Sequence, residues 1–222
     1  MKKINSVCVY CASSTKINQV YFDAANRLGK ILAEKGIRII NGAGNIGLMG
    51  EISDSALAAG GKVTGVIPHF MVEQGWNHTG LTELIEVPDM HVRKQTMARM
   101  SDAVIALPGG CGTMEELLEI ITWKQLGLYL HPIVILNVNG FFNPLLEMLR
   151  RAVDENFMRS NTVQYGLLPK HRKKLWSLCF LCRIGTRIYG VLLQYKIWGV
   201  FIPHPIFYWA RRLKSIPMFL LS

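Results

Sequence analysis

Residues 103–127 read AVIALPGGCGTMEELLEIITWKQLG. The apolar run at 103–107 is typical of a buried β-strand, and the glycine-rich turn at 108–112 leads from it into the pattern of a helix. A buried strand followed at once by a helix is the repeating unit of parallel sheets that helices cover on both faces. This stretch therefore predicts an α/β fold.

The same alternation extends through the first 160 residues. It predicts further strands at 7–11, 37–40, 62–67 and 133–136, and helices near 19–35, 47–59, 91–100, 113–127 and 143–157. Ligands of parallel sheets bind where strands end and loops lead into helices. Three loops of this kind stand out, namely CASSTK at 11–16, NGAGNIGLMG at 41–50 and PGGCGTMEE at 108–116.

Charge is distributed unevenly along the 222 residues, whose formal net charge is +10. Residues 1–161 hold 15 basic and 15 acidic side chains, whereas residues 162–222 hold the other 10 basic ones and no acid. The first part lacks the basic surface that nucleic acid requires, so we expect no nucleic-acid partner. We predict one domain over residues 1–161, long enough to bury a core.

The basic, apolar tail at 162–222 does not continue the α/β pattern. Its longest uncharged run, 197–210, contains two prolines and falls short of the roughly 20 residues of a membrane span. We interpret the tail as a frame-shifted or disordered end, with a membrane-surface segment as the alternative. The apolar run near the N-terminus is too short for a signal peptide, and we expect a cytoplasmic protein.

Five cysteines, an odd number, favour free thiols over a disulfide framework. Cys8 with Cys11 and Cys179 with Cys182 have the spacing of zinc ligands. However, an offset of three along a strand places the first pair on opposite faces of the sheet. We therefore expect no metal site.

The loop at 41–50 places Gly42, Gly44 and Gly47 in G-x-G-x-x-G spacing between a predicted strand and a helix. Backbone N–H groups at such a helix start attract phosphate, although a tight turn that binds nothing has the same pattern. The following strand, in GKVTGVIP, ends without the acid that would hold a ribose hydroxyl. This disfavours a dinucleotide-dependent oxidoreductase.

The loop at 108–116 supports two interpretations. Gly109, Gly110 and Gly112 would expose backbone N–H groups to an anion, and Thr113 would add a hydroxyl near the helix start. Alternatively, Thr113 and Glu116 have the spacing of a capping box, in which the glutamate only closes the helix start.

Basic residues near the start of the helix at 91–100 point to an anion nearby. Arg93 and Lys94 oppose the helix dipole there, so a ligand phosphate or a carboxylate must lie close to them. An exposed surface ion pair is the alternative. His91 is interpreted as a structural or surface histidine.

Together these motifs resemble the Lonely Guy family of cytokinin riboside 5′-monophosphate phosphoribohydrolases, over about residues 5–158. The family signature P-G-G-x-G-T-x-x-E matches at every fixed position of 108–116, and M-H-x-R-K matches at 90–94. The resemblance implies a Rossmann-like, doubly wound parallel sheet in three layers, and a homodimer without a cofactor. It also implies hydrolysis of the N-glycosidic bond of a nucleoside 5′-monophosphate to free base and ribose 5-phosphate.

The resemblance further implies roles for individual residues. Arg93 and Glu116 would be catalytic. The substrate-binding residues would be Gly42, Gly44, Glu73, Lys94, Gly109, Gly110, Gly112, Thr113, Glu115 and Thr122. Ala12 and Ala43 replace glycines of the family pattern, and Ala43 would crowd a ligand if its φ were positive.

Cleavage of a ribosyl–base bond develops positive charge on the sugar, which a carboxylate at Glu116 would stabilise. A guanidinium at Arg93 would lower the pKa of that carboxylate and keep it ionised. Two alternatives stay open: hydrolysis of unmodified AMP, and a non-catalytic carrier of nucleotide or molybdenum cofactor. No motif for a pyridoxal phosphate site is found.

Overall fold

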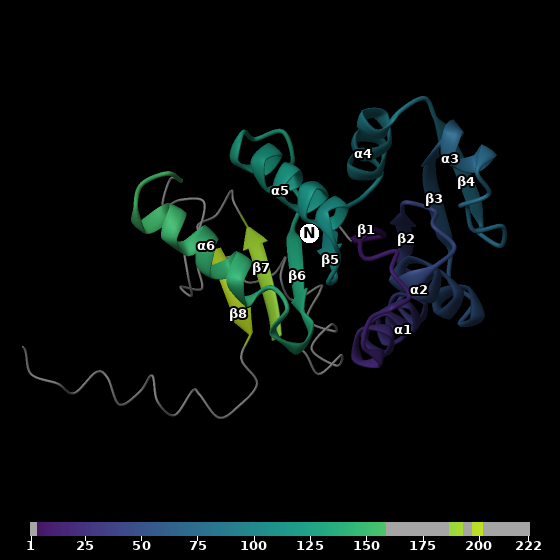
Figure 1. Cartoon of the computed structure of the whole chain (residues 1–222), viewed down its shortest axis with the longest axis horizontal. Coiled ribbons are helices and arrows are strands. Elements are labelled where there is room, and N and C mark those ends of the chain that lie inside the picture. The colour runs from purple at the N-terminus through teal and green to yellow at the C-terminus, as the bar shows by residue number, and fades with distance from the viewer. Residues whose placement is uncertain (1–3, 159–186, 193–196, 202–222) are drawn as a thin grey trace, which may run out of the picture.

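The computed structural model describes residues 4–158, 187–192 and 197–201 (Figure 1). Strands and helices alternate along most of this part of the chain. In order they are β1 Ser6–Tyr10, α1 Gln19–Glu34, β2 Arg38–Asn41, α2 Gly47–Ala58, β3 Val63–Pro68, α3 His69–Glu73, β4 Glu83–Val87, α4 Met90–Arg99, β5 Val104–Ala106, α5 Cys111–Gln125, β6 Ile133–Asn137, the 3-10 turn η1 Val138–Gly140, α6 Asn143–Asp154, β7 Arg187–Leu192 and β8 Ile197–Phe201.

One sheet contains all of these strands, in the order β4-β3-β2-β1-β5-β6-β7-β8. The six strands from β4 to β6 are parallel, while β7 pairs antiparallel with β6 and β8 antiparallel with β7. The chain winds outward from β1 to β4 and then returns to place β5 on the other side of β1. This reversal makes the sheet doubly wound and confirms the predicted α/β class.

Helices cover both faces of the sheet, so the fold has three layers (Figure 1). One core lies beneath α1 and α2 and includes Val7 and Val9, and the other lies beneath α4, α5 and α6 and includes Cys8 and Tyr10. Alternate residues of β1 thus enter different cores, because successive side chains of a strand point to opposite faces. Burial on both faces explains why the central strands are continuously apolar.

The predicted strands and helices are all present, but several other elements escaped prediction. The turn η1 and the tail strands β7 and β8 are among them. The other two are α3, a single short turn, and β4, whose sequence ELIEV carries two acids and is largely exposed. β4 is the edge strand of the sheet, and an edge strand needs no continuous apolar run. Because its two acids interrupt the apolar run, β4 lacks the pattern by which the buried strands were predicted.

The three loops singled out in the sequence meet at the carboxyl edge of the sheet. The backbone N–H of Ala12, after β1, donates to the carbonyl of Pro108, after β5, at 3.2 Å. The carbonyl of Ala12 accepts from the N–H of Leu48, at the start of α2, at 2.9 Å. Ala12 therefore connects the loops after β1, β2 and β5 at the reversal of the strand order, the expected ligand position in such a sheet.

The tail lies largely outside the described residues, apart from the backbones of β7 and β8, and so does the cysteine pair Cys179 and Cys182. Cys8 and Cys11 are both buried and belong to different cores, as the strand periodicity predicts. Within the described ranges, the helices are all too short or too polar to cross a membrane.

Candidate active site

The start of α5 is open, and it is not closed by a capping box. The helix begins at Cys111, its N-cap is Gly110, and no side chain hydrogen bonds to the cap. Thr113 is the third residue of the helix rather than its cap, so the capping interpretation of Thr113 and Glu116 is wrong. The first N–H groups of a helix lack intrahelical partners, and here no side chain satisfies them.

The glycines around this helix start differ in their surroundings. A Cβ at Gly109 would overlap the hydroxyl of Thr113, whereas a Cβ at Gly110 or Gly112 would meet no atom within 4 Å. Thr113 is only 5% exposed, and its hydroxyl has no hydrogen-bond partner among the described residues. Free N–H groups at a helix start favour an anion, and the role of Thr113 toward such a ligand stays a prediction.

Arg93 is buried against backbone carbonyls. Its Nη2 donates to the carbonyl of Gly42 at 2.7 Å and its Nε donates to the carbonyl of Val66 at 3.0 Å. A Cβ at position 42 would overlap the guanidinium, so only glycine permits this contact. The alternative of an exposed surface ion pair is therefore wrong for Arg93.

The remaining nitrogen of Arg93 faces sulfur rather than oxygen. Its Nη1 lies 3.5 Å from the Sδ of Met90 and 3.8 Å from the Sδ of Met71. Burial lowers the pKa of Arg93 and the charge of Glu116 opposes that shift, but an arginine remains charged in proteins. The guanidinium of Arg93 thus contacts methionine sulfurs on one side and backbone carbonyls on the other.

Glu116 lies one turn beyond Thr113 on α5 and is half-buried. Burial raises the pKa of its carboxyl to about 7, although the charge of Arg93 acts to lower it. Arg93 acts on the pKa of Glu116 in the predicted direction, but burial outweighs it, so at neutral pH the carboxyl is only partly ionised. Among the described residues the carboxyl has no hydrogen-bond or ion-pair partner.

The carboxyl of Glu116 interacts with groups at the carboxyl end of β1. Its charge contributes to the raised pKa values of Tyr10 and Cys11, in both of which burial is the main cause. Glu116 therefore sits above the reversal point between β1 and β5. A carboxyl that titrates near neutral pH at this position can act as a base or as an electrostatic stabiliser.

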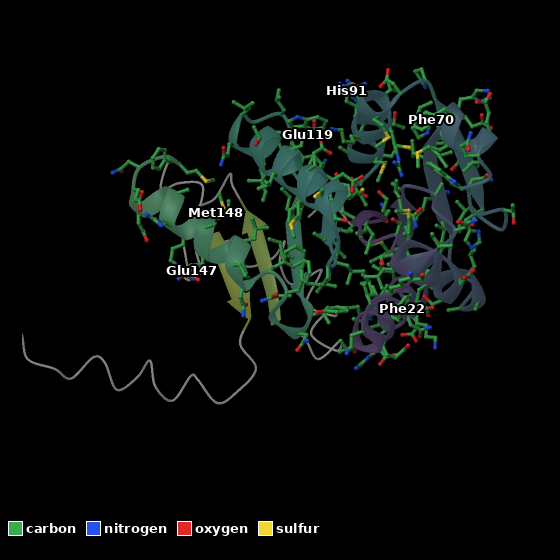
Figure 2. The ribbon with its side chains drawn as sticks, viewed as in Figure 1. Phe22, Phe70, His91, Glu119, Glu147 and Met148 are labelled. Carbon is green, nitrogen blue, oxygen red and sulfur yellow. The ribbon has the colours of Figure 1, made fainter. Side chains whose placement is uncertain are left out.

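Lys94 links α4 to α5. Its side chain is 8% exposed, and its Nζ contacts the carboxylate of Glu115 and lies 3.1 Å from Oε2 of Glu119. Figure 2 shows Glu119 on α5, on the side of that helix next to α4. The anion expected near Lys94 is thus a pair of carboxylates, those of Glu115 and Glu119. Lys94 follows Arg93 in the sequence and Glu115 precedes Glu116, so this ion pair joins the two helices next to the predicted catalytic residues.

Two other predicted substrate residues lie farther from this centre. Thr122 is exposed on α5, and its hydroxyl donates to the carbonyl of Leu118 in the preceding turn at 2.8 Å. Glu73 ends α3 and lies 3.5 Å from the Nε2 of His69, with most of its side chain exposed. Among the described residues neither forms a hydrogen bond or ion pair with Arg93 or Glu116, and their roles toward substrate stay predictions.

The loop at 41–50 uses its N–H groups within the protein. The N–H of Ala43 donates to Oδ1 of Asn41 at 2.9 Å, and the N–H of Gly44 faces the Sδ of Met49 at 3.0 Å. The first N–H groups of α2 donate to the carbonyl of Ala12. This loop therefore presents its carbonyl at Gly42 to Arg93, whereas the start of α5 has no such internal partners.

The backbone of Ala43 does have a positive φ, of 60°. This conformation is unusual for a residue with a Cβ. The side chain of Ala43 is fully buried, and the carbonyl accepts from the N–H of His78 at 2.8 Å. The replacement of glycine at this position thus imposes strain on the loop that holds Arg93.

Sequence reasoning missed Met71 and Met90 as the wall of the Arg93 site. Met90 belongs to the quoted motif M-H-x-R-K, and its spacing of three from Arg93 on a helix could have indicated contact. Met71 lies in the unpredicted helix α3, so no signal placed it. Within residues 4–158 and the two tail strands, no three His, Cys, Asp or Glu side chains are grouped as metal ligands.

Solved structures with a similar fold include two proteins of molybdenum cofactor metabolism. The molybdenum cofactor carrier protein of Chlamydomonas reinhardtii matches with a TM-score of 0.55 and 23% identity, covering 69% of this chain and 86% of that one. The molybdenum cofactor binding protein of Rippkaea orientalis matches with a TM-score of 0.54 and 23% identity, covering 70% and 86%. At this identity the likeness concerns the fold.

Sequence comparison is more specific. Residues 49–179, more than half of the chain, match the model of a family described as possible lysine decarboxylase. This match extends past residue 158, where the motifs had ended.

The curated relatives have a different name from that description. The probable cytokinin riboside 5′-monophosphate phosphoribohydrolase LOGL2 of Oryza sativa is 44% identical over 173 residues, or 78% of this chain and 71% of the relative. The enzymes LOG5 and LOG4 of Arabidopsis thaliana are 45% and 46% identical over 173 residues, covering 76% and 80% of their lengths. The chain therefore belongs to the Lonely Guy family of cytokinin riboside 5′-monophosphate phosphoribohydrolases.

Proposed function

We propose that this chain, through residues 1–161, hydrolyses the N-glycosidic bond of an N6-modified adenosine 5′-monophosphate and releases the free base and ribose 5-phosphate. The names of relatives at 44–46% identity support this activity. One observation carries the proposal: Glu116 is a half-buried carboxyl with a pKa near 7 and no partner among the described residues, one turn from an open helix start.

The 5′-phosphate binds at the start of α5 in this proposal. The N–H groups there and the hydroxyl of Thr113 offer hydrogen bonds, and Gly110 and Gly112 leave the space open for a phosphate. Phosphate binding then holds the ribose in place along α5. Binding energy far from the reacting bond fixes the geometry of the sugar and assists its cleavage.

Bond cleavage places positive charge on C1′ and O4′ of the ribose. The carboxylate of Glu116 stabilises this charge and orients a water molecule. The oxygen of this water bonds to C1′ as the bond from C1′ to the base nitrogen breaks. One proton of the water ends on the departing base. Burial destabilises the carboxylate of Glu116 before the reaction. In the transition state the positive charge on the ribose attracts this carboxylate and stabilises it. Arg93 favours the ionised carboxyl and holds its own position through Gly42 and Val66.

We also propose that the protein acts as a homodimer in the cytoplasm. Large apolar side chains are exposed just after α5, on α6 and just after α6, and exposed apolar surface of this kind supports an association surface. They are Leu126, Leu128, Met148 and Phe157. Free thiols at Cys8, Cys11 and Cys111 agree with a reducing compartment.

The test is incubation of the purified chain with isopentenyladenosine 5′-monophosphate and, separately, with AMP, followed by chromatography for free base and ribose 5-phosphate. Release of isopentenyladenine supports the proposal, and faster release of adenine from AMP would assign an AMP nucleosidase instead. Glu116→Gln should abolish release while nucleotide binding persists. Glu147→Gln, an exposed glutamate on α6, serves as the matched control. Nucleotide binding without release by the wild-type chain would indicate a carrier.

A further inference from the structure

Asn41 ends β2 and is fully buried, and both ends of its side-chain amide form hydrogen bonds. Its Oδ1 accepts from the backbone N–H of Ala43 at 2.9 Å, and its Nδ2 donates to Oγ of Ser53 at 2.9 Å. The hydroxyl of Ser53 donates in turn to the carbonyl of Met49, one turn earlier on α2, at 2.8 Å. A backbone N–H can only donate, so the contact with Ala43 fixes which end of the amide is the oxygen. Asn41 thus connects the turn after β2 to α2.

The peptide unit between Gly42 and Ala43 lies between Asn41 and Arg93. Its N–H is the donor to Asn41, and its C=O is the acceptor of the 2.7 Å bond from Nη2 of Arg93. The unit is planar and trans, so its N–H and C=O point in opposite directions. Because the N–H is held toward the amide of Asn41, the carbonyl of Gly42 is directed toward the guanidinium.

The backbone of this turn needs such support, because Ala43 has a φ of 60°. Backbone conformations of this kind persist only where the surrounding structure holds them. The N–H of Ala43 is held by Asn41, and its carbonyl accepts from the N–H of His78 at 2.8 Å. Without the bond to Asn41, the peptide unit after Gly42 is free to rotate and relieve the strain. The guanidinium of Arg93 would then lose its 2.7 Å hydrogen bond.

We propose that Asn41, supported by Ser53, is a positioning residue that directs the carbonyl of Gly42 toward Arg93 and so holds the guanidinium in place for catalysis. The inference rests on the proposed function, because it takes Arg93 as a catalytic residue. Among the described residues, the side chain of Asn41 hydrogen bonds to Ala43 and Ser53 and not to Arg93, so it acts through the backbone. The glycine spacing of the loop at 41–50 gave Asn41 no role.

The test is Asn41→Leu in the full chain, because leucine has the same branched shape and forms neither hydrogen bond. The variant should lower kcat by about 10- to 100-fold, as misplacement of a catalytic group does. The KM for the nucleotide should change less, because the start of α5 is untouched. Arg93 acts on the pKa of Glu116, so the midpoint of the dependence of kcat/KM on pH should also move. Wild-type kcat, or wild-type KM and midpoint together with a kcat loss below twofold, would overturn the inference.

The matched control is Asn137→Leu at the end of β6. Asn137 is 3% exposed, its Oδ1 accepts from the N–H of Phe142 at 2.7 Å, and its Nδ2 donates to Oδ1 of Asn143 at 2.7 Å. It therefore loses the same two kinds of bond, but none that leads to Arg93. Urea denaturation should show both variants destabilised, whereas Asn137→Leu should keep the wild-type kcat and midpoint. An equal loss of kcat in both variants would assign the effect to general destabilisation and overturn the inference.

A second readout needs no turnover, because the charge of Arg93 acts on the pKa of Glu116 in the free protein. The difference in unfolding free energy between the chain and its Glu116→Gln variant is measured at pH 5 and pH 8, with and without Asn41→Leu. Asn41→Leu should change how far this difference grows with pH, and Asn137→Leu should not. No change with Asn41→Leu would overturn the inference. A wild-type chain that releases no base refutes the proposed hydrolysis, and this readout still decides the role of Asn41.

Ser53→Ala serves if Asn41→Leu does not fold. It removes the bond from Asn41 to Ser53 and leaves the bond between Asn41 and Ala43 in place. This variant should lower kcat severalfold, with KM again changed less. Wild-type kcat in a folded Ser53→Ala would then overturn the inference.

Discussion

The carbonyl of Gly42 accepts a hydrogen bond of 2.7 Å from the guanidinium of Arg93, across 51 residues of sequence. Gly42 belongs to a loop that has the spacing of a phosphate-binding motif, yet its carbonyl contacts a buried cation. The glycine is needed there because a Cβ would overlap the guanidinium. The loop after β2 therefore holds the guanidinium of Arg93, whereas among the described residues no side chain caps the start of α5, in the loop after β5.

Gly42→Ala tests this contact directly. The new Cβ should displace the guanidinium from Gly42 and Val66 and lower kcat by about 10- to 100-fold, as misplacement of a catalytic group does. The KM for the nucleotide should change less than kcat, because the start of α5 is untouched. Steady-state kinetics measure both constants, and circular dichroism checks folding. A variant with wild-type kcat would show that the position of Arg93 is unimportant.

The pKa of Glu116 makes a prediction about stability. Its folded-state value, about 7, exceeds the unfolded value of 4.5, so the folded protein binds the proton more tightly. The contribution of Glu116 to the free energy of unfolding is therefore largest below pH 4.5, and it is lost as the pH rises through 7. Glu116→Gln has no carboxyl to ionise, so it should not lose stability as the pH rises. At pH 8 it should be more stable than the wild type by on the order of 2–3 kcal/mol.

Urea denaturation of both proteins at pH 5 and pH 8 measures this difference. The advantage of the glutamine variant should be several times larger at pH 8 than at pH 5. The exposed Glu147→Gln should show no such dependence on pH. Equal stabilities of wild type and Glu116→Gln at pH 8 would contradict a buried, destabilised carboxylate.

The pH dependence of turnover provides a further prediction. If the ionised form of Glu116 is active, kcat/KM should rise with pH through about 7, because kcat/KM reports the pKa of the free enzyme. The charge of Glu115 raises the pKa of Glu116, so Glu115→Gln should move the midpoint to lower pH. The phosphate of the substrate titrates identically with both enzymes, so a difference between their midpoints belongs to the protein. An unchanged midpoint would argue against Glu116 as the titrating group.

Sequence patterns predicted the fold well because its central strands are buried on both faces. The continuous apolar runs that mark β1 and β5 follow directly from that burial. The half-exposed edge strand β4 lacked the signal. Motif order also indicated Arg93 and Glu116 together, although they lie 23 positions apart in the sequence.

Local sequence did not predict the environment of these residues. The pKa of Glu116 depends on burial and on the charges of Arg93 and Lys94 from another helix, and the pattern of α5 does not contain that information. Nor did the glycines at 109–112 distinguish a capped helix from an open one. That difference rests on α5 starting two residues earlier than predicted, which moves Thr113 inside the helix.

Lys94 yields the last prediction, because its bridge to Glu115 and Glu119 sets the position of α4 against α5. Lys94→Met removes a charge that lowers the pKa of Glu116, so the midpoint of the kcat/KM profile should rise. This shift is opposite in direction to that of Glu115→Gln. The variant also leaves two carboxylates without their cation, and unfolding should become easier by about 1–3 kcal/mol.

Lys94→Arg is the matched control, since it keeps the charge and should hold the midpoint near that of the wild type. The two variants therefore separate electrostatic action on Glu116 from direct binding of the phosphate. If Lys94 instead bound the phosphate, Lys94→Met would raise KM at every pH and leave the midpoint unchanged. A rise in the midpoint without a rise in KM identifies Lys94 as a residue that acts on Glu116 through its charge and does not bind the substrate.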